Sequence, residues 1–500
     1  MSITKYLFYI LTILLTGFGF SSFKKNDETI KPITPPKTTI KEQTNNTSQP
    51  VQDGYAAIYT NKDNELMLTK TNNETYTIVK ENGQSSSVQY AHNNYEAILF
   101  TKDNVLYLLK TTDINNHKII ADNVENFFFT DDDKYIIYTT KTTDTNLYYK
   151  SLNKDPIKID SEITKIIDYS NNYIIYTKND SLYIQKLDYE SKTIKISDNT
   201  SSAVTFSKDE KRVIYLDNDK NLYTYSIFQN KSTKITSSVK NYIIDNTGSK
   251  IYYIPEGAQQ DIYYYDGSIT NQIAEKITMI NDTIVENEQI LYSSCDESNS
   301  CTLYYIKEDS EPIRVESNIT DISAGFITNN EFYYHYKEEN IDKLKYVKIN
   351  NKEIKKISEL TTNVGLVTKI NGGIIFTSIL NDDKVGSLYS VKNGTMKKID
   401  ENIYTPSLKV SNDGNKYYYL KSYKENKQSG DLYVSTEETK YIIDKDVYRK
   451  FTYTSDKLIY YIKDYSLASY TGTLYKYNGE SVKISENANE LKNTPNYYKG

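Results

Sequence analysis

The sequence is poor in the residues on which most enzyme chemistry depends. Its 500 residues include three histidines (His92, His117 and His335), which lie in separate parts of the chain. It has no HExxH motif, no GxSxG elbow, no Walker A loop and no GxGxxG turn after a predicted strand. We therefore assign no catalytic or cofactor-binding residue and expect no cofactor.

Cysteine is nearly absent too, which argues against a metal site built on sulfur. Cys295 and Cys301 are the two cysteines, and two sulfur atoms without a nearby histidine do not complete a zinc site. Cys295 ends one predicted strand and Cys301 begins the next, so a hairpin would bring their Cα atoms within bridging range. In an exported protein we expect a disulfide between them; a pair of free thiols is the alternative.

The chain also lacks a strong excess of either charge. It has 60 Lys and Arg against 66 Asp and Glu, for a net charge of −6, and the lysines are evenly spread. This balance argues against a surface for nucleic acid or anionic membranes. Asp131-Asp132-Asp133 and Asp217-Asn218-Asp219 offer calcium-type ligands, but both lie at predicted turns and neither follows an EF-hand loop. We expect no metal at either.

Proline is scarce and unevenly placed. Four of the nine prolines lie within residues 24–54, among Thr, Lys, Asn and Gln. Such a segment cannot bury a core, so we expect a disordered stalk that is either a plain linker or a spacer above a membrane.

The one long apolar run precedes this segment. Residues 6–23 would span about 27 Å as a helix, close to the hydrocarbon thickness of a bilayer. Residues 1–23 are thus a membrane anchor or a signal peptide, and cleavage after residue 21 would give a secreted protein. No cysteine follows the run, which excludes a bacterial lipoprotein. We expect the rest of the chain to lie outside the cytoplasm.

What the sequence has in abundance is a repeat. A Leu-Tyr pair, with three degenerate copies, recurs eleven times at steps of 35 to 44 residues. The copies are Leu66-Met67, Leu106-Tyr107, Leu147-Tyr148, Leu182-Tyr183, Leu222-Tyr223, Ile262-Tyr263, Leu303-Tyr304, Leu344-Lys345, Leu388-Tyr389, Leu432-Tyr433 and Leu474-Tyr475. A fixed period of this size indicates a repeat architecture.

Each repeat contains four short apolar and aromatic runs separated by polar turns. In one unit they are residues 173–176, 182–184, 193–196 and 203–206. These runs alternate or are continuously β-branched, and they lack helical spacing, so they predict strands. Four short strands in about 40 residues are typical of one blade of a β-propeller. With 51 tyrosines and no tryptophan, we expect tyrosine to pack the blades.

Polar turns precede the first run of several units, and these turns carry a family resemblance. They occupy residues 130–134, 207–211, 245–250 and 411–416. Their pattern is Ser-x-Asp-Gly-x-Lys, and a minority of the units have the Gly. This turn, an aromatic strand and then Leu-Tyr resembles the WD40-like repeats of TolB-type and dipeptidyl-peptidase-type propellers over residues 55 to about 490. The resemblance implies the fold and leaves function open.

Eleven blades exceed the four to eight of an ordinary ring. Because the repeat spacing rises from about 40 to about 43 residues near residue 288, we expect two tandem propellers. Residues 55–288 would form about six blades and residues 289–500 about five; a single large or open ring is the alternative.

Two functions follow as hypotheses. The first is a non-catalytic binding or scaffolding protein, tethered through residues 6–23, with a protein, peptide or glycan as partner. The alternative is a surface glycan hydrolase or lyase that uses carboxylates at a propeller mouth.

Overall fold

The computed structural model describes residues 55–492, except 71, 92–96, 202, 258–260, 285–288, 308–309, 351–352, 371, 380–383, 393–394, 412 and 456–457. The expected anchor and stalk lie outside the described residues. Within them the chain forms forty strands and one short 3-10 helix, η1 (Gly83–Ser85). No helix in this part of the chain is both long and apolar enough to cross a bilayer.

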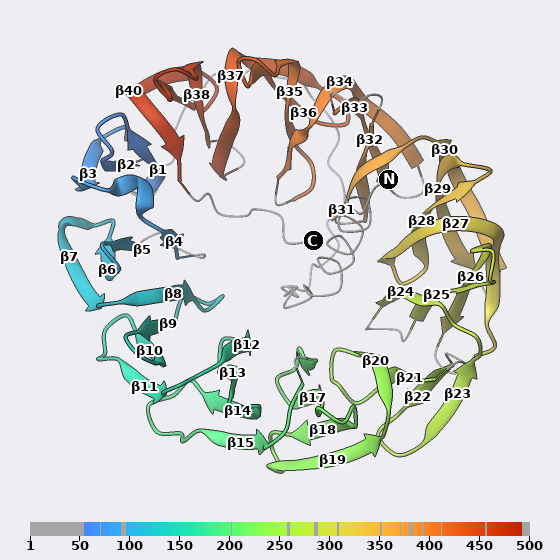
Figure 1. Cartoon of the computed structure of the whole chain (residues 1–500). Coiled ribbons are helices and arrows are strands. Elements are labelled where there is room, and N and C mark those ends of the chain that lie inside the picture. The colour runs from blue at the N-terminus through green and yellow to red at the C-terminus, as the bar shows by residue number, and fades with distance from the viewer. Residues whose placement is uncertain are drawn as a thin grey trace, which may run out of the picture. The chain divides into compact units, whose positions relative to one another are not determined.

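The strands form eleven four-stranded antiparallel blades, numbered here in chain order, that follow one another around a ring (Figure 1). Blades 2 to 6 are separate sheets. The other blades share strands: β27 serves blades 7 and 8, and β34, β37 and β40 link blades 9, 10, 11 and 1. The described chain is a β-propeller.

The strands of blades 1 to 6 have the following bounds. They are β1 (Tyr55–Asn61), β2 (Leu66–Lys70), β3 (Thr75–Val79); β4 (Val88–Tyr90), β5 (Ala97–Lys102), β6 (Val105–Lys110), β7 (Asp113–Ala121); β8 (Val124–Phe129), β9 (Tyr135–Lys141), β10 (Thr145–Ser151), β11 (Ile157–Asp160); β12 (Lys165–Tyr169), β13 (Tyr173–Lys178), β14 (Ser181–Lys186), β15 (Ile194–Ser197); β16 (Val204–Phe206), β17 (Arg212–Leu216), β18 (Leu222–Ser226), β19 (Lys231–Thr236); and β20 (Val239–Ile244), β21 (Ile251–Pro255), β22 (Ile262–Tyr265), β23 (Thr270–Ala274).

Several strands of blades 7 to 11 are longer, which accounts for the wider repeat spacing there. They are β24 (Met279–Ile284), β25 (Gln289–Cys295), β26 (Cys301–Lys307), β27 (Ile313–Thr328); β28 (Glu331–Glu338), β29 (Ile341–Asn350), β30 (Glu353–Thr361); β31 (Val364–Ile370), β32 (Gly373–Ile379), β33 (Val385–Lys392), β34 (Thr395–Val410); β35 (Tyr417–Lys424), β36 (Ser429–Ser435), β37 (Lys440–Ser455); and β38 (Leu458–Ser466), β39 (Thr471–Tyr477), β40 (Ser481–Leu491).

The blade begins one strand earlier than the sequence unit suggested. Residues 204–206, expected to close one unit, form β16 and open the next blade, because Val204 pairs with Tyr215 of β17. The continuous apolar run of each repeat is thus the second strand of its blade. That strand is covered on both faces, as β32 shows with six consecutive buried residues, so it dominates the apolar pattern.

Eleven apolar clusters hold the blades together, and each cluster joins two consecutive blades. Their members include the largest fully buried side chains of the described chain, which are all tyrosines. The cluster around Tyr252 and Tyr292 joins blade 6 to blade 7 across residue 288. The described residues accordingly belong to one compact unit.

The first and last blades are also neighbours. The end of β40 pairs with β1, with Leu491 opposite Tyr59 and Ala488 opposite Asn61, and so supplies the first strand of blade 1. Figure 1 shows β40 beside β1 to β3. A further cluster packs Tyr59 of blade 1 against Tyr460 and Leu474 of blade 11.

Each Leu-Tyr pair lies opposite a one-residue β-bulge. Leu147 pairs with Asp160 and Tyr148 with Lys158, so Ile159 of the fourth strand has no partner. The same irregularity occurs in all eleven blades, and the extra residue is Val315 in blade 7 and isoleucine elsewhere: Ile78, Ile120, Ile159, Ile196, Ile235, Ile273, Ile357, Ile399, Ile443 and Ile484.

One copy of the repeat was placed wrongly from the sequence. In blade 8 the bulge lies opposite Tyr346 and Val347, two residues after the expected Leu344-Lys345. Tyr346 takes the buried position that Leu holds in other blades, and the longer strands of this blade hid the shift.

The polar turns link the first strand to the second, and one residue in each has a positive φ as turn chemistry requires. Gly248 and Gly414 occupy that position in two turns, with φ of 62° and 69°, and Asp133 and Glu210 occupy it in two others. A Cβ on Gly248 would come within 2.6 Å of Ile214 of the preceding blade, so close packing also favours glycine there.

We predict that Ala488→Glu destabilises the ring at its junction. Ala488 is fully buried and pairs with both Asn61 and Gly472, where blades 1 and 11 meet. A buried unpaired carboxylate should cost about 3 kcal/mol or more and lower the Tm by several degrees. Val482→Glu is the control, because Val482 lies on the same strand and is 36% exposed. Equal Tm values for the two variants in calorimetry would contradict this packing.

Candidate functional site

The bulge decides which side chains meet at the seam between two blades. Leu182 packs towards the next blade, whereas Tyr183 packs towards the preceding one. Ile159 packs into the seam between blades 3 and 4, and the following Asp160 reaches Tyr176 of blade 4. The bulge therefore turns two successive residues of the fourth strand towards the same neighbour.

At three seams the residue after the bulge is an aspartate that binds a tyrosine and a lysine of the next blade. Asp160 accepts hydrogen bonds from Tyr176 and Lys178, both at 2.9 Å. The same arrangement recurs at two later seams. Asp400 meets Tyr419 and Lys421 between blades 9 and 10, and Asp444 meets Tyr461 and Lys463 between blades 10 and 11. We call these three sets the seam triads.

Asp400 forms the most enclosed triad. Its side chain is 3% exposed and accepts from Tyr419 at 2.7 Å, Lys421 at 2.9 Å and Lys440 at 2.8 Å. Burial acts to raise the pKa of Asp400, but the bonds from Lys440, Lys421 and Tyr419 outweigh it and lower the pKa. Burial raises the pKa of Tyr419. The aspartate therefore stays ionised and the phenol stays neutral at neutral pH.

Two other seams also bring the residue after the bulge to a tyrosine hydroxyl of the next blade. Tyr215 meets Ser197 and Ser232, and at the seam of blades 7 and 8 Glu316 accepts from Tyr334 at 3.0 Å and from Lys345. Lysine stands two residues after the second-strand tyrosine in all three triads. The charges of a triad thus compensate each other within the seam.

One carboxyl group differs from those of the triads. Burial, followed by the nearby charge of Asp131, raises the pKa of Asp168 to about 6. Asp168 lies on the first strand of blade 4, and next to it Tyr169 stacks on Phe128 of blade 3 at 4.3 Å between ring centroids. A carboxyl group whose pKa is raised by burial is a feature of general acids in enzyme sites.

The histidines and acidic turns singled out in the sequence are not brought together. His117 contacts Phe100 edge-on in blade 2, and His335 pairs with Asp342 at 3.1 Å within blade 8. Mainly through burial, the pKa of His335 is lowered. His92 lies outside the described residues.

Both candidate calcium turns use their acidic side chains to cap the backbone. Asp132 accepts from the N–H of Lys134, and Asp217 accepts from the N–H of Asn221. The described residues contain no group of three His, Cys, Asp or Glu side chains placed to hold a metal ion.

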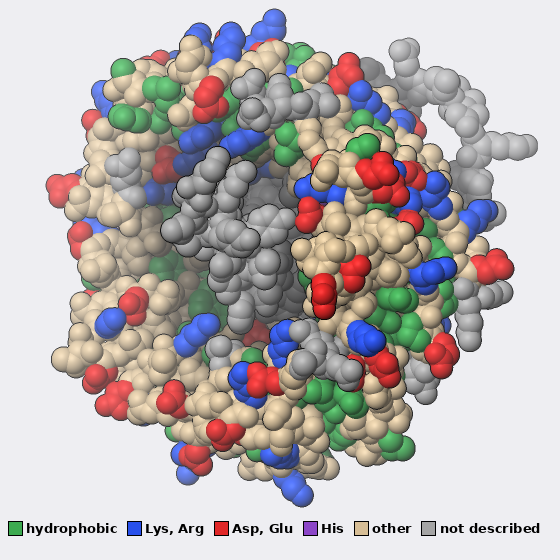
Figure 2. Space-filling view, turned by 45° about the vertical axis from the view of Figure 1, so that its right-hand side comes forward, with side chains coloured by type: hydrophobic (Ala, Val, Ile, Leu, Met, Phe, Trp, Pro, Cys, Tyr) green, Lys and Arg blue, Asp and Glu red, His purple; other side chains and the backbone are tan. Residues whose placement is uncertain are grey.

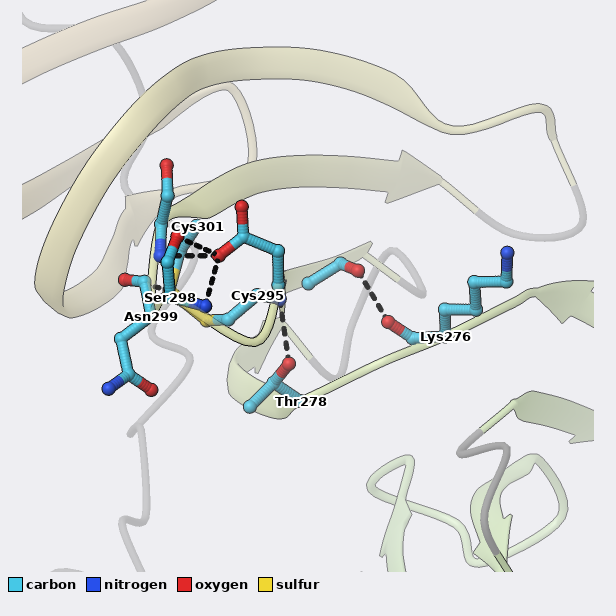
Figure 3. The surroundings of a disulfide bond; sticks show 9 residues. Lys276, Thr278, Cys295, Ser298, Asn299 and Cys301 are labelled. Carbon is cyan, nitrogen blue, oxygen red and sulfur yellow. Dashed lines mark hydrogen bonds between the residues drawn. A yellow bond between two sulfur atoms is a disulfide. The ribbon is translucent and has the colours of Figure 1, made fainter.

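The two cysteines face each other across the hairpin of β25 and β26, and the structure joins them by a disulfide (Figure 3). Their Cα atoms are 3.9 Å apart. Asp296 accepts from the N–H groups of Ser298 and Ser300 and so orders the turn.

A cluster of tyrosines, two of them buried, two half-buried and one exposed, lies where blades 10 and 11 extend beyond the triads. Tyr404 stacks on Tyr423 at 3.7 Å between ring centroids, and Tyr448 stacks on Tyr465 at 3.9 Å. Arg449 is exposed and hydrogen-bonds to Tyr448, with Tyr423 and Tyr404 within electrostatic range. Tyr470, close to Tyr465, is 62% exposed. We define the Tyr–Arg patch as Tyr404, Tyr423, Tyr448, Arg449, Tyr465 and Tyr470.

Elsewhere the surface is mixed. Figure 2 shows basic and acidic side chains interspersed over the face in view. Four outer-strand lysines pair with an acidic residue three positions later, because the bulge puts both on one side of the strand: Lys195 with Asp198, Lys356 with Glu359, Lys398 with Glu401 and Lys483 with Glu486.

No known protein family matches the chain, and no curated protein matches it in sequence. Among solved structures, a eukaryotic initiation factor gives a TM-score of 0.45 at 8% identity, over 88% of this chain and 98% of that one. The tricorn protease gives 0.27 at 11%, over 88% and 59%. TolB from Acinetobacter baumannii gives 0.21 at 14%, over 53% and 64%. These likenesses concern the propeller-type fold alone, and the fold assignment rests on the strand pairing above.

The triads and the patch were not predicted from the sequence, although a signal for the triads exists. The triplet Lys-Ile-Asp or Lys-Ile-Ser follows the Leu-Tyr pair in several repeats, as in residues 158–160 and 398–400. Its isoleucine is the bulged residue, and its last residue faces the next blade. Where that residue is Asp, a Tyr-x-Lys sequence follows in the next repeat.

We predict that Asp400→Asn lowers stability by about 2 kcal/mol at neutral pH. The change removes charge-assisted bonds from two lysines, although both lysines are partly exposed and can turn to water. Asp198→Asn is the control, because that side chain is 83% exposed and its surface pair should contribute less than about 1 kcal/mol. Unfolding midpoints in denaturant measure both changes.

The same comparison has a defined pH dependence. Because the folded pKa of Asp400 is lowered from 3.8, its stabilising contribution is complete above that unfolded value. It disappears as pH falls through the lower folded pKa. The difference in the free energy of unfolding between wild type and Asp400→Asn should therefore disappear only on strong acidification. A difference that is unchanged at low pH would contradict an ionised triad.

Proposed function

We propose that residues 55–492 close as a single ring of eleven WD40-like blades of the TolB type. Two observations support one ring over separate propellers of residues 55–288 and 289–500. The strand that completes blade 1 comes from β40, and the cluster of blades 6 and 7 bridges residue 288. Separate rings would each need to close within their own half of the chain.

We further propose that this ring is a non-catalytic binding or scaffolding module for a protein, peptide or glycan partner. The observation that carries the proposal is the state of the seam triads. Their aspartates have lowered pKa values and their tyrosines raised ones. Groups fixed in one protonation state suit blade packing and do not suit proton transfer. The exposed side chains of the Tyr–Arg patch, Arg449 and Tyr470, are then part of the surface offered to a partner.

The location that we propose is the outer side of a cell membrane, with residues 6–23 as the tether and residues 24–54 as the stalk. The apolar run supports export, and the Cys295–Cys301 disulfide is consistent with an oxidising compartment. If residues 1–21 are removed by a signal peptidase, the ring is secreted instead.

Protease treatment of intact cells tests this location. We expect added protease to remove an epitope at the C-terminal end of the chain without lysis, because the ring lies outside. The recovered protein should take up a thiol-alkylating reagent on Cys295 and Cys301 only after reduction. An epitope protected in intact cells and lost after lysis, or two thiols that react without reduction, would refute the exported ring.

The second candidate function is that of a glycan hydrolase or lyase, and the raised pKa of Asp168 is the observation that favours it. A carboxyl group of raised pKa near Asp131, beside the stacked rings of Phe128 and Tyr169, has the elements of a glycosidase acid and base pair.

We predict that Asp168 and Asp131 do not act as a catalytic pair. Wild type and Asp168→Asn should give the same background with a panel of cell-wall and plant polysaccharides, measured as new reducing ends or unsaturated products. Asp198→Asn is the control for loss of an exposed carboxylate. Turnover by wild type that falls by about a hundredfold or more in Asp168→Asn alone would establish the enzyme instead.

A further inference from the structure

The charge on the inner wall of the ring is unevenly distributed. The first strand of each blade lies nearest the centre of the ring (Figure 1). In blades 9, 10, 11 and 1 this strand is formed by β31 and by the final parts of β34, β37 and β40. On these strands, or directly after one of them, lie four lysines that we call the lysine arc: Lys369, Lys409, Lys450 and Lys492.

Few carboxylates oppose the lysine arc. Within the four strand segments, residues 364–370, 405–410, 449–455 and 488–492, the sequence has one acid, Glu490. Glu490 accepts from Lys450 and lies 4.0 Å from Lys492, so one carboxylate is shared by two lysines. Arg449 is not counted in the arc, because the exposed Asp446 is its near neighbour in the chain.

The remaining inner strands do not have this excess of positive charge. Among the described side chains, the first strands of blades 3 to 8 hold two lysines and three acids: Lys165, Lys240, Glu125, Asp168 and Asp321. The basic side chains are therefore confined to one sector of the wall. Figure 2 shows basic side chains on the upper left wall of the central hollow.

Lys409 is the member of the arc whose charge is least compensated. Its ammonium group lies over the ring of Phe451 of blade 11, 5.6 Å from the ring centroid. No carboxylate of the described chain lies within ion-pair distance of it. Burial lowers the pKa of Lys409, so the fold disfavours its charged form. An anion that approaches from the hollow would stabilise that form.

Lys492 repeats the position of Lys409. Lys409 pairs with Tyr418 of β35, and the N–H of Lys492 donates to the carbonyl oxygen of Ile58 of β1. Tyr418 and Ile58 are equivalent, because each directly precedes the second-strand tyrosine of its blade. Burial lowers the pKa of Lys492 as well. Lys450 lies on the blade between them, so the positive charges follow the curve of the wall.

The spread of the arc over four blades suits a chain-like anion. Lysine is a compact point charge without the planar fork of arginine, so it takes phosphate and carboxylate oxygens alike. Phe451 is 3% exposed and covered by Lys409, so it offers no stacking surface to a nucleobase. Leu408, Phe451 and Leu491 belong to the apolar clusters between blades, so these strands present no apolar anchor for peptide side chains.

We propose that the lysine arc binds an acidic glycan, a sugar polymer that carries phosphate or carboxylate groups along its length. The ammonium groups contact successive acidic groups of the chain. Sugar hydroxyls bond to backbone N–H and C=O groups on the inner edge of the first strands, which pair with the second strand on their other side. The inference rests on the proposed binding function and narrows its partner to one chemical class.

The test titrates the full chain, in mild detergent, into fluorescein-labelled polygalacturonate, which carries carboxylates, and labelled poly(ribitol phosphate), which carries phosphates. Labelled dextran is the neutral sugar control. Fluorescence anisotropy should show binding of at least one acidic polymer and none of dextran, and binding should weaken as salt rises. Binding of polygalacturonate alone identifies carboxylates as the ligand groups, and binding of poly(ribitol phosphate) alone identifies phosphates.

Charge variants assign the binding to the arc. Lys409→Gln with Lys450→Gln should lose about tenfold or more in affinity, because two of the four charges are removed. Lys231→Gln with Lys234→Gln makes the same change in net charge on the exposed outer strand of blade 5 and should bind like wild type.

Glu490→Gln removes the opposing carboxylate and should bind about threefold more tightly. Lys450→Gln alone, at a side chain that is 49% exposed, keeps the test valid if the double variant does not fold.

Three results would overturn the proposal. They are no binding of either acidic polymer, an equal loss of affinity in the blade 5 control, and tighter binding of poly-glutamate or oligothymidylate than of the glycans. Tighter binding of poly-glutamate would leave the ring a binding module and remove the glycan site. Polysaccharide turnover that depends on Asp168 would instead overturn the non-catalytic function, and the affinities of the arc variants would stand.

Discussion

The contact on which the fold depends is the packing of each third strand against the blades on both sides. A leucine of the Leu-Tyr pair faces the next blade and the tyrosine faces the preceding one. Two adjacent residues therefore connect three blades, and eleven repetitions carry the connection around to blade 1. A pattern of this kind cannot vary freely, because a one-residue slip would exchange the two faces and leave every seam mismatched.

The bulge resolves a conflict created by this alternation. A regular fourth strand would send isoleucine to one neighbour and the following residue to the other. With an extra residue, both face the next blade, so the isoleucine fills the apolar seam, and in the triads the residue after it meets a tyrosine hydroxyl. Where that residue is aspartate, burial would be costly without compensation. The lysine two places beyond the tyrosine provides the opposite charge, which explains why aspartate and lysine occur together across repeats that lie far apart in the sequence.

Much of the fold was predictable, because local patterns depend on local physics. The period, the short strands, the positive-φ turn residue and the facing cysteines all follow from neighbouring residues. The start of each blade was not predicted correctly, because the most apolar run is the second strand and so looks like the beginning of a unit. The shift in blade 8 escaped because Tyr346 replaces leucine at a buried position. Each seam triad joins an aspartate to residues 16 to 21 positions later on the next blade, and the Tyr–Arg patch combines residues of two blades, so neither is contained in a single repeat.

The regularity of the ring also bears on where function resides. Side chains that recur in most blades, such as the stacked tyrosine of the third strand, are explained by packing and carry no information about a partner. Departures from the repeat are more informative, because the seams do not require them. The stacked pairs of Tyr404 and Tyr448 are such a departure only in part. They lie on strands extended past the bulge, but both buried rings belong to the apolar clusters that join blades 10 and 11 and blades 11 and 1, so packing accounts for them. The exposed side chains beside them, Arg449 and Tyr470, are the part that the seams do not require.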